Sequence, residues 1–188
     1  MLHLASRSPR RRQLLQQLGI EFAVIDVEVV DCRDAAESPL AYVQRVAHDK
    51  ARAGLASLGD GAADAVVLGA DTEVVLDGEV FGKPRDAQDA VAMLGRLAGR
   101  THEVISALWL VANRRELAAV SVSQVRFAAL DAAAIAAYVG TGEPFGKAGG
   151  YAIQGRGGAL VEYLAGSYSG VMGLPLFETA QALREFAG

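Results

Sequence analysis

Two tight turns between apolar runs constrain the fold of this chain more than any other feature of its sequence. Asp77-Gly78 separates the runs "EVVL" and "EVF", and the segment "NRRE" at 113–116 separates two long apolar runs. Asp-Gly between such runs is a strong signal for a hairpin, and hairpins join antiparallel strands. An all-parallel sheet is therefore excluded.

The rest of the chain alternates between strand and helix patterns. Strand patterns occur at 2–5, in "EFAVIDVEVV" at 21–30 and in "VVLGADTEVVL" at 66–76. This alternation predicts an α/β fold with a mixed sheet. Helices are expected to begin at four N-cap residues, and a last helix is expected at the end of the chain: Ser8, Ser38, Asp86, Asp131, and about 175–186.

The chain is long and apolar enough to form one globular domain. It has 188 residues, of which 52% are hydrophobic, so most of its apolar surface can be buried in a single unit over 1–188. Trp109, Phe127 and Tyr163 occur in strand patterns and are expected in the core. No repeat or low-complexity linker interrupts the sequence.

Charge and cysteine content exclude several classes of function. The net charge of −4 argues against a nucleic-acid or anionic-lipid partner, so any basic site must be local. Cys32 is the single cysteine, which leaves no disulfide framework and fits a reducing compartment. The apolar run at the N-terminus is too short for a signal peptide, and no stretch approaches the roughly 18 to 20 apolar residues of a membrane span. We expect a soluble, cytoplasmic protein.

The segment "LASRSPRRRQLL" at 4–15 places positive charge where a helix begins. Ser6, Ser8, Arg10 and Arg11 combine hydroxyl groups, free helix N–H groups and guanidinium groups. Cations are unfavourable at a helix N-terminus, and a bound polyphosphate would offset this crowding. The segment therefore predicts an anion site, and the alternative is a solvated basic turn.

The run "VVLGADTEVVL" is interrupted by Asp71 and Thr72. Burying a carboxylate in a strand without a partner costs several kcal/mol, so Asp71 must meet a cation, a metal or a water-filled cleft. The alternative is an aspartate that caps a turn at a strand end. Lys83 follows in "GKPRD", and Lys50 lies on the apolar stripe of a helix; a solvated lysine and a snorkelling lysine are the respective alternatives.

The segment "GKAGGYAIQGRGG" at 146–158 is unusually rich in glycine. Glycine at this density within strands marks bulges, turns or backbone pressed against a ligand. Gln154 offers both a donor and an acceptor, as contact with the edge of a base requires. The alternative is a bulged hairpin that binds nothing.

Taken in order along the chain, four segments resemble the Maf family of nucleoside triphosphate pyrophosphatases. They are "LASRSPRRRQLL", "VLGADTEVVLDGEVFGKPRD", "GKAGGYAIQGRGG" and "VMGLPLFET", and the resemblance covers essentially the whole chain. The resemblance implies an elongated mixed sheet flanked by helices and two lobes with a cleft, related to the inosine triphosphate pyrophosphatase fold. It also implies a homodimer and a divalent cation, Mg²⁺ or Mn²⁺.

The same resemblance implies hydrolysis between the α and β phosphates and assigns roles to the matching residues. Asp71 corresponds to the catalytic base, and Ser8, Arg10 and Arg11 correspond to the phosphate-binding turn. Lys50 and Lys83 correspond to the lysines of the family. An acidic pair that relatives carry before the second helix is matched here by "VEVVDCRD", which leaves Asp31 and Glu28 as alternative counterparts of its glutamate.

Three of these positions divide the family by substrate. Arg10, Thr72 and Gln154 resemble members selective for dTTP and UTP, whereas relatives that act on 7-methyl-GTP differ at the first and last of these positions. The implied function is hydrolysis of dTTP and UTP, with modified pyrimidine triphosphates as further candidates. A regulatory protein of septum formation that acts through a partner is the alternative function.

Overall fold

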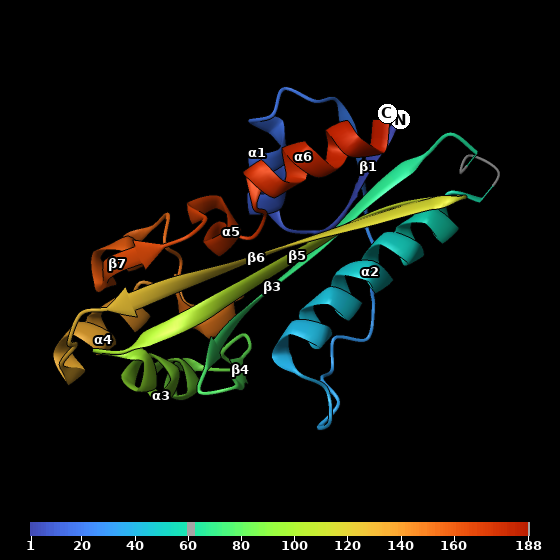
Figure 1. Cartoon of the computed structure of the whole chain (residues 1–188). Coiled ribbons are helices and arrows are strands. Elements are labelled where there is room, and N and C mark those ends of the chain that lie inside the picture. Colours follow the sequence, from blue (N-terminus) through green and yellow to red (C-terminus); the bar gives the residue numbers. More distant parts are fainter. Residues whose placement is uncertain (60–62, 188) are drawn as a thin grey trace.

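A mixed sheet runs the length of the molecule. The computed structural model describes residues 1–59 and 63–187 of the chain. Within these residues, seven strands form one sheet in the order β2-β1-β3-β5-β6-β7, with β4 paired to β3 outside this path (Figure 1). The strands are β1 (Leu2–Ala5), β2 (Phe22–Ile25), β3 (Val66–Leu76), β4 (Glu79–Phe81), β5 (Thr101–Ala112), β6 (Arg115–Phe127) and β7 (Val161–Ala165).

Strand directions confirm the predicted mixed sheet. β1 is parallel to β2 and to β3, whereas β3 is antiparallel to β4 and β5, and β6 is antiparallel to β5 and β7. Asp77 and Gly78 have φ values of 52° and 77°, as a two-residue hairpin of type I′ requires. The second hairpin is tighter than "NRRE" indicated, because Arg115 already pairs with Ala112.

Helices flank the sheet, and all but the one at 168–172, which was not predicted, begin where the sequence predicted. They are α1 (Pro9–Gln16), α2 (Pro39–Ser57), α3 (Ala87–Leu97), α4 (Ala132–Val139), α5 (Tyr168–Met172) and α6 (Leu176–Ala187), with 3₁₀ turns η2 (Ala148–Gly150) and η3 (Arg156–Leu160). The side chains of Ser8, Ser38, Asp86 and Asp131 each accept a hydrogen bond from a backbone N–H of the first turn. No helix among the described residues could span a bilayer.

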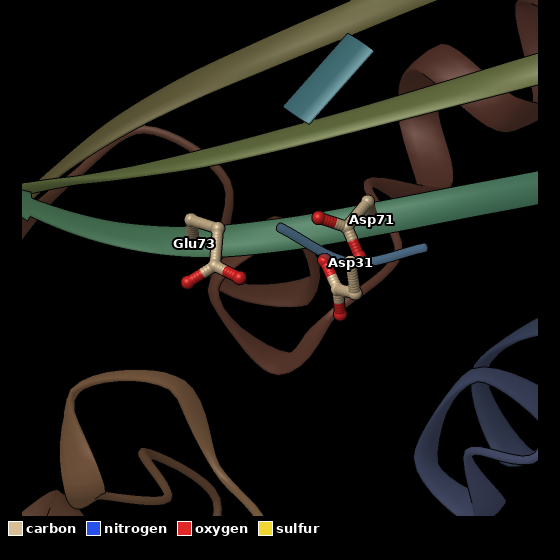
Figure 2. A group of neighbouring side chains, drawn as sticks. All are labelled: Asp31, Asp71 and Glu73. Carbon is tan, nitrogen blue, oxygen red and sulfur yellow. The ribbon is translucent and has the colours of Figure 1, made fainter. Parts of the chain in front are cut away.

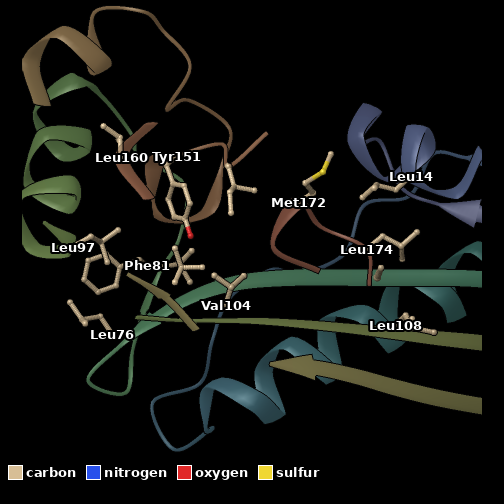
Figure 3. Packing of buried hydrophobic residues seen from close by; sticks show 14 of the residues in the cluster. Leu14, Leu76, Phe81, Leu97, Val104, Leu108, Tyr151, Leu160, Met172 and Leu174 are labelled. Atoms are coloured by element: carbon tan, nitrogen blue, oxygen red, sulfur yellow. The ribbon is translucent and has the colours of Figure 1, made fainter. Parts of the chain in front are cut away.

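The two faces of β3 pack against different helices. Val67 and Val75 face α2, whereas Leu68, Ala70 and Val74 belong to the larger core that also contains residues of α1, α3 and α6. Alternate residues of a strand point to opposite faces, which explains the division. Figure 3 shows part of the larger core, where Tyr151 and Leu160 lie over the strands.

Three expectations differ from the structure. The strand expected at 21–30 stops at Ile25, because β1, its partner among the described residues, ends at Ala5. The glycine-rich segment forms the 3₁₀ turns η2 and η3 and no strand between 146 and 160. Tyr163 was expected in the core but is 57% exposed, since it lies on the edge strand β7; Phe127 is buried as predicted.

Candidate active site

A break in the pairing of β3 creates the candidate site. β1 pairs with β3 only as far as Ala5 and Gly69, and β4 begins to pair at Val74 and Phe81. Among the described residues, 70–73 of β3 therefore have no strand on this edge, although they remain paired with β5 on the other. Asp71, Thr72 and Glu73 of this stretch line a cleft with a volume of about 610 Å³.

The cleft brings together every site residue that the sequence singled out. Its lining combines the turn before α1, one residue of α2, the open stretch of β3, the loop after β4 and the glycine-rich segment. The predicted residues on its wall are Ser8, Arg10, Arg11, Lys50, Asp71, Thr72, Lys83 and Gln154.

Asp71 lies within β3 and meets cations from two other elements. Its side chain is 6% exposed, and its Oδ1 accepts a hydrogen bond from Lys50 Nζ at 2.6 Å. A guanidinium nitrogen of Arg11 lies 3.9 Å from the same oxygen. Oδ2 is buried and has no hydrogen-bond partner among the described residues. Asp71 thus does not cap a turn, and Lys50 contacts a carboxylate rather than snorkelling to solvent.

Asp71 also belongs to a cluster of three carboxylates (Figure 2). Oxygen atoms of Asp31, Asp71 and Glu73 all lie within 4.8 Å of one another. Glu28 lies elsewhere on the cleft wall, where its carboxylate pairs with Arg7 at 2.9 Å. Of the two alternatives that the sequence left open, the structure therefore places Asp31 beside Asp71.

Glu73 is the main residue of the site that the sequence interpretation missed. Its side chain faces the cleft from β3 and is 7% exposed, and its Oε2 is buried without a partner among the described residues. Burial, followed by the charges of Asp71 and Asp31, raises the pKa of Glu73 to about 8. A strand places residues i and i+2 on one face, so the spacing from Asp71 was a usable signal.

The carboxylate cluster fits a divalent cation. Mg²⁺ and Mn²⁺ prefer oxygen ligands, and all three side chains offer them. Asp71 and Glu73 each have a buried oxygen without a hydrogen-bond partner among the described residues. The neighbouring carboxylates also add to the effect of burial in raising the pKa of Glu73. A bound cation would satisfy both oxygens and offset the repulsion between the carboxylates. The cluster can therefore accommodate such an ion.

The two arginines of the phosphate turn have different surroundings. Arg11 donates hydrogen bonds from Nε to the carbonyl of Gly173 at 2.8 Å and from a terminal nitrogen to Thr72 Oγ1 at 3.3 Å. Burial lowers the pKa of Arg11 against the opposing effect of Asp71. Arg10 makes one long contact, from Nε to the carbonyl of Met172 at 3.4 Å. Arg11 thus ties α1 to the segment before α6, while Arg10 is freer to bind an anion.

Thr72 points to the face of β3 opposite Asp71. Its hydroxyl group lies 2.7 Å from Ser106 Oγ and 3.3 Å from the carbonyl of Gly173. Ser106 in turn donates to the carbonyl of Gly170 at 2.6 Å. These contacts fix the wall of the cleft between β3 and α5.

The other wall of the cleft comes from the glycine-rich segment. Gln154 is exposed there, and Lys147 is half-buried nearby. Burial, and then the charge of Arg10, lower the pKa of Lys147. Lys83 is exposed in the loop between β4 and α3. The cleft therefore has carboxylates at its floor and cations around its mouth, an arrangement suited to a metal-bound polyphosphate.

Comparison with known proteins gives matches over the whole chain. A family model described as Maf-like protein matches residues 1–186. A dTTP/UTP pyrophosphatase of Xanthomonas campestris pv. campestris is 59% identical over 187 residues, covering 99% of this chain and 98% of the relative. A nucleoside triphosphate pyrophosphatase of Xylella fastidiosa is 59% identical with the same coverage.

Among solved structures, the chain matches in part a nucleoside-triphosphatase / dITP/XTP pyrophosphatase from Mycobacterium abscessus. The similarity covers 67% of this chain and 73% of that chain, with 19% identity and a TM-score of 0.48.

Proposed function

Because this chain belongs to the Maf family, we propose that it hydrolyses dTTP and UTP to the nucleoside monophosphate and pyrophosphate. One observation carries this function: the cleft joins the carboxylate cluster, in which Asp71 and Glu73 are buried, to Arg10, Lys83 and Lys147 within a single space. Relatives that share 59% of the sequence are named for the same reaction. A role through a protein partner alone would not require this chemistry.

In the proposed reaction, water attacks the α phosphorus and the bond to the bridging oxygen breaks. A new P–O bond forms to the water oxygen, and pyrophosphate leaves with the electron pair. Asp71 takes the proton of the water.

Asp31, Asp71 and Glu73 would hold Mg²⁺ or Mn²⁺. When bound, such an ion polarises phosphate oxygens and neutralises their charge. Lys50 and Tyr42 orient two of these carboxylates, since Tyr42 donates a hydrogen bond to Asp31 Oδ1 at 2.6 Å. Orientation by such outer partners is typical of metal sites in proteins.

The cations at the mouth of the cleft would bind the β and γ phosphates. Arg10 and Lys147 both have a lowered pKa, for which burial is the main cause, and each also feels a neighbouring positive charge. A polyphosphate placed between them would relieve this repulsion. The Ser8 hydroxyl group and the backbone N–H of Arg10 add neutral donors to the same site, whereas the N–H groups of Arg11 and Arg12 already donate to Ser8.

Selectivity for dTTP and UTP is assigned to Arg10, Thr72 and Gln154. The amide of Gln154 can pair with the adjacent carbonyl and N–H groups that uracil and thymine share. Its exposed position on the wall opposite the carboxylates supports a contact with the base. The 5-position of the ring does not enter this contact, so modified pyrimidines would be accepted as well.

The substrate assignment is tested by pyrophosphate release from dTTP, UTP, CTP, GTP and 7-methyl-GTP with Mg²⁺ or Mn²⁺. Turnover of dTTP and UTP well above that of the others is expected. Preferential turnover of 7-methyl-GTP or GTP would show that the roles of Arg10, Thr72 and Gln154 are misassigned.

We further propose that the chain is a single catalytic unit and a cytoplasmic homodimer. Cleft residues range from Ala5 to Gly173, so the site draws on segments spread over most of the chain. Val122, Tyr163 and Tyr168 are exposed apolar side chains that a second copy could cover. Sedimentation of the protein as a monomer at micromolar concentration would contradict the dimer.

The cytoplasmic location is supported by the nucleotide substrates and by Cys32, a free and exposed cysteine that fits a reducing compartment.

A further inference from the structure

The side chain of Glu143 forms hydrogen bonds with the backbone of the turn that carries Gln154. The carboxylate of Glu143 accepts hydrogen bonds from the backbone N–H of Arg156 at 3.0 Å and from that of Gly157 at 2.9 Å. Gln154 is two residues before the first of these donors. No strand pairing supports this stretch, because the turn lies between η2 and β7. A backbone hydrogen bond from the N–H of Gly155 to the carbonyl of Ala152 at 3.0 Å closes the turn, and side-chain contacts fix its place beside the cleft.

Tyr138 of α4 ties the other end of the turn to the same carboxylate. Its hydroxyl group donates to Glu143 Oε1 at 2.8 Å and accepts from the backbone N–H of Ala152 at 3.1 Å. Tyr138 is buried, so the pair is anchored on a helix. The turn is thus fixed two residues before Gln154 and again two and three residues after it.

Close packing confirms that the carboxylate fills the inside of the turn. A Cβ atom added to Gly155, the residue next to Gln154, would lie 2.3 Å from Glu143 Oε2. Only glycine allows the backbone to approach the carboxylate so closely. Although burial acts to raise it, the pKa of Glu143 is lowered by the N–H groups of Gly157 and Arg156 and by the Tyr138 hydroxyl group. The ionised form is therefore the one that the turn stabilises.

We propose that Glu143 is a positioning residue for base recognition, which acts by fixing the turn that presents Gln154 to the cleft. This inference rests on the proposed function, in which Gln154 contacts the pyrimidine. Glu143 itself does not line the cleft, and its contacts are to the backbone of the turn and to Tyr138. Its loss should therefore affect the contribution of the base and leave phosphate chemistry unchanged.

The experiment compares kcat/KM for dTTP with kcat/KM for ribose 5-triphosphate, which has no base. In Glu143→Gln, an amide NH₂ group replaces an acceptor of the turn N–H groups, and the ratio of the two values should fall about tenfold. The value for ribose 5-triphosphate alone should not change. Gln154→Ala should lower the ratio similarly, and the double variant should lose little more than either single variant, because both act through one contact. Glu162→Gln, on β7 and outside the cleft, is the matched control.

Tyr138→Phe provides a second route if Glu143→Gln does not fold. It retains the carboxylate and removes one hydroxyl group, and a smaller fall of the same ratio is expected. An unchanged ratio in these variants, an equal loss with both substrates, or additive losses in the double variant would each overturn the inference. If Gln154→Ala leaves the ratio unchanged, the base contact in the proposed function is wrong and the inference fails with it. A fall in Gln154→Ala alone contradicts only the role of Glu143.

Discussion

At the scale of single residues, Glu73 places a third carboxyl group beside Asp31 and Asp71 with a buried oxygen that no described residue contacts. Removing one oxygen ligand should weaken the binding of a divalent cation at least about tenfold. We therefore expect Glu73→Gln to raise the Kd for Mn²⁺, measured by electron paramagnetic resonance of the free ion. Glu28→Gln, which alters a carboxylate of the same cleft paired with Arg7, should bind Mn²⁺ like the unmodified protein. Equal Kd values for all three proteins would exclude Glu73 as a ligand.

His102 gives the stability of the protein a predictable dependence on pH. It is buried, its Nε2 lies 2.9 Å from the hydroxyl group of Tyr151, and burial lowers its pKa to about 4. In the unfolded chain the group has its ordinary pKa of about 6.5. Unfolding therefore takes up a proton at any pH between these values. The free energy of unfolding should fall by about 3 kcal/mol as the pH drops from 7 to 4.

The contribution of His102 can be isolated with His102→Gln, which keeps a polar partner for Tyr151 but does not titrate. Urea unfolding at several pH values should show a smaller loss of stability in this variant than in the unmodified protein. Identical slopes of stability against pH between 6.5 and 4 would show that His102 is not the group responsible.

At the scale of secondary structure elements, the site depends on how closely α2 packs against β3. A Cβ atom added to Gly69 would lie 2.3 Å from the carbonyl oxygen of Ala47 and 2.5 Å from the backbone nitrogen of Ala51. Both atoms belong to the backbone of α2, which also carries Lys50. Gly69→Ala should thus push α2 outward, destabilise the fold by about 1–3 kcal/mol and lower turnover by moving Lys50 away from Asp71.

Gly95→Ala is the matched control for this change. Gly95 lies within α3, and an added Cβ atom there would meet nothing within 4 Å. Replacement of glycine by alanine in a helix is stabilising by about 0.5–1 kcal/mol. Thermal unfolding should therefore shift in opposite directions for the two variants. A stable and fully active Gly69→Ala protein would show that α2 is not held at this distance.

The sequence predicted correctly those helix starts and turns that depend on interactions between residues close together in the chain. Ser38 begins a helix because its side chain accepts a hydrogen bond from the N–H of Ala41, and Asp77-Gly78 forms a hairpin because both residues accept positive φ. Ile25 ends β2 for a reason that its own sequence does not contain, namely the end of β1 at Ala5. Tyr163 is exposed for a similar reason, because β7 has a neighbour on one side only.

The same division applies to the candidate site. Asp71 was identified because a carboxylate inside an apolar strand requires a partner, and Lys50 supplies one at 2.6 Å. Glu73 was not identified, since its significance depends on the open edge of β3 between β1 and β4. Glu143 is 11 residues before Gln154, and nothing in the local pattern connects the two. Long-range pairing thus determines which polar residues share the cleft.

At the scale of the whole molecule, the cleft exists because the sheet is incomplete at one place. The pairing of β1 with β3 ends at Gly69, before Asp71, and the pairing of β4 with β3 begins at Val74, after Glu73. The stretch of β3 between them is covered by side chains from distant segments instead. The turn before α1, the helix α2 and the glycine-rich segment all reach this stretch. We therefore propose that these segments together cleave the bond between the α and β phosphates, with Asp71 as the base.

The most direct measurement is the product composition after dTTP is incubated with Mg²⁺ and the protein or its Asp71→Asn variant, determined by anion-exchange chromatography. Asparagine keeps the size of the side chain but cannot take a proton, so a loss of at least about 100-fold in turnover is expected. Circular dichroism should show that the variant remains folded. The proposed function requires the unmodified protein to form dTMP and pyrophosphate in equal amounts. Formation of dTDP and phosphate, or undiminished turnover by a folded Asp71→Asn protein, would contradict it.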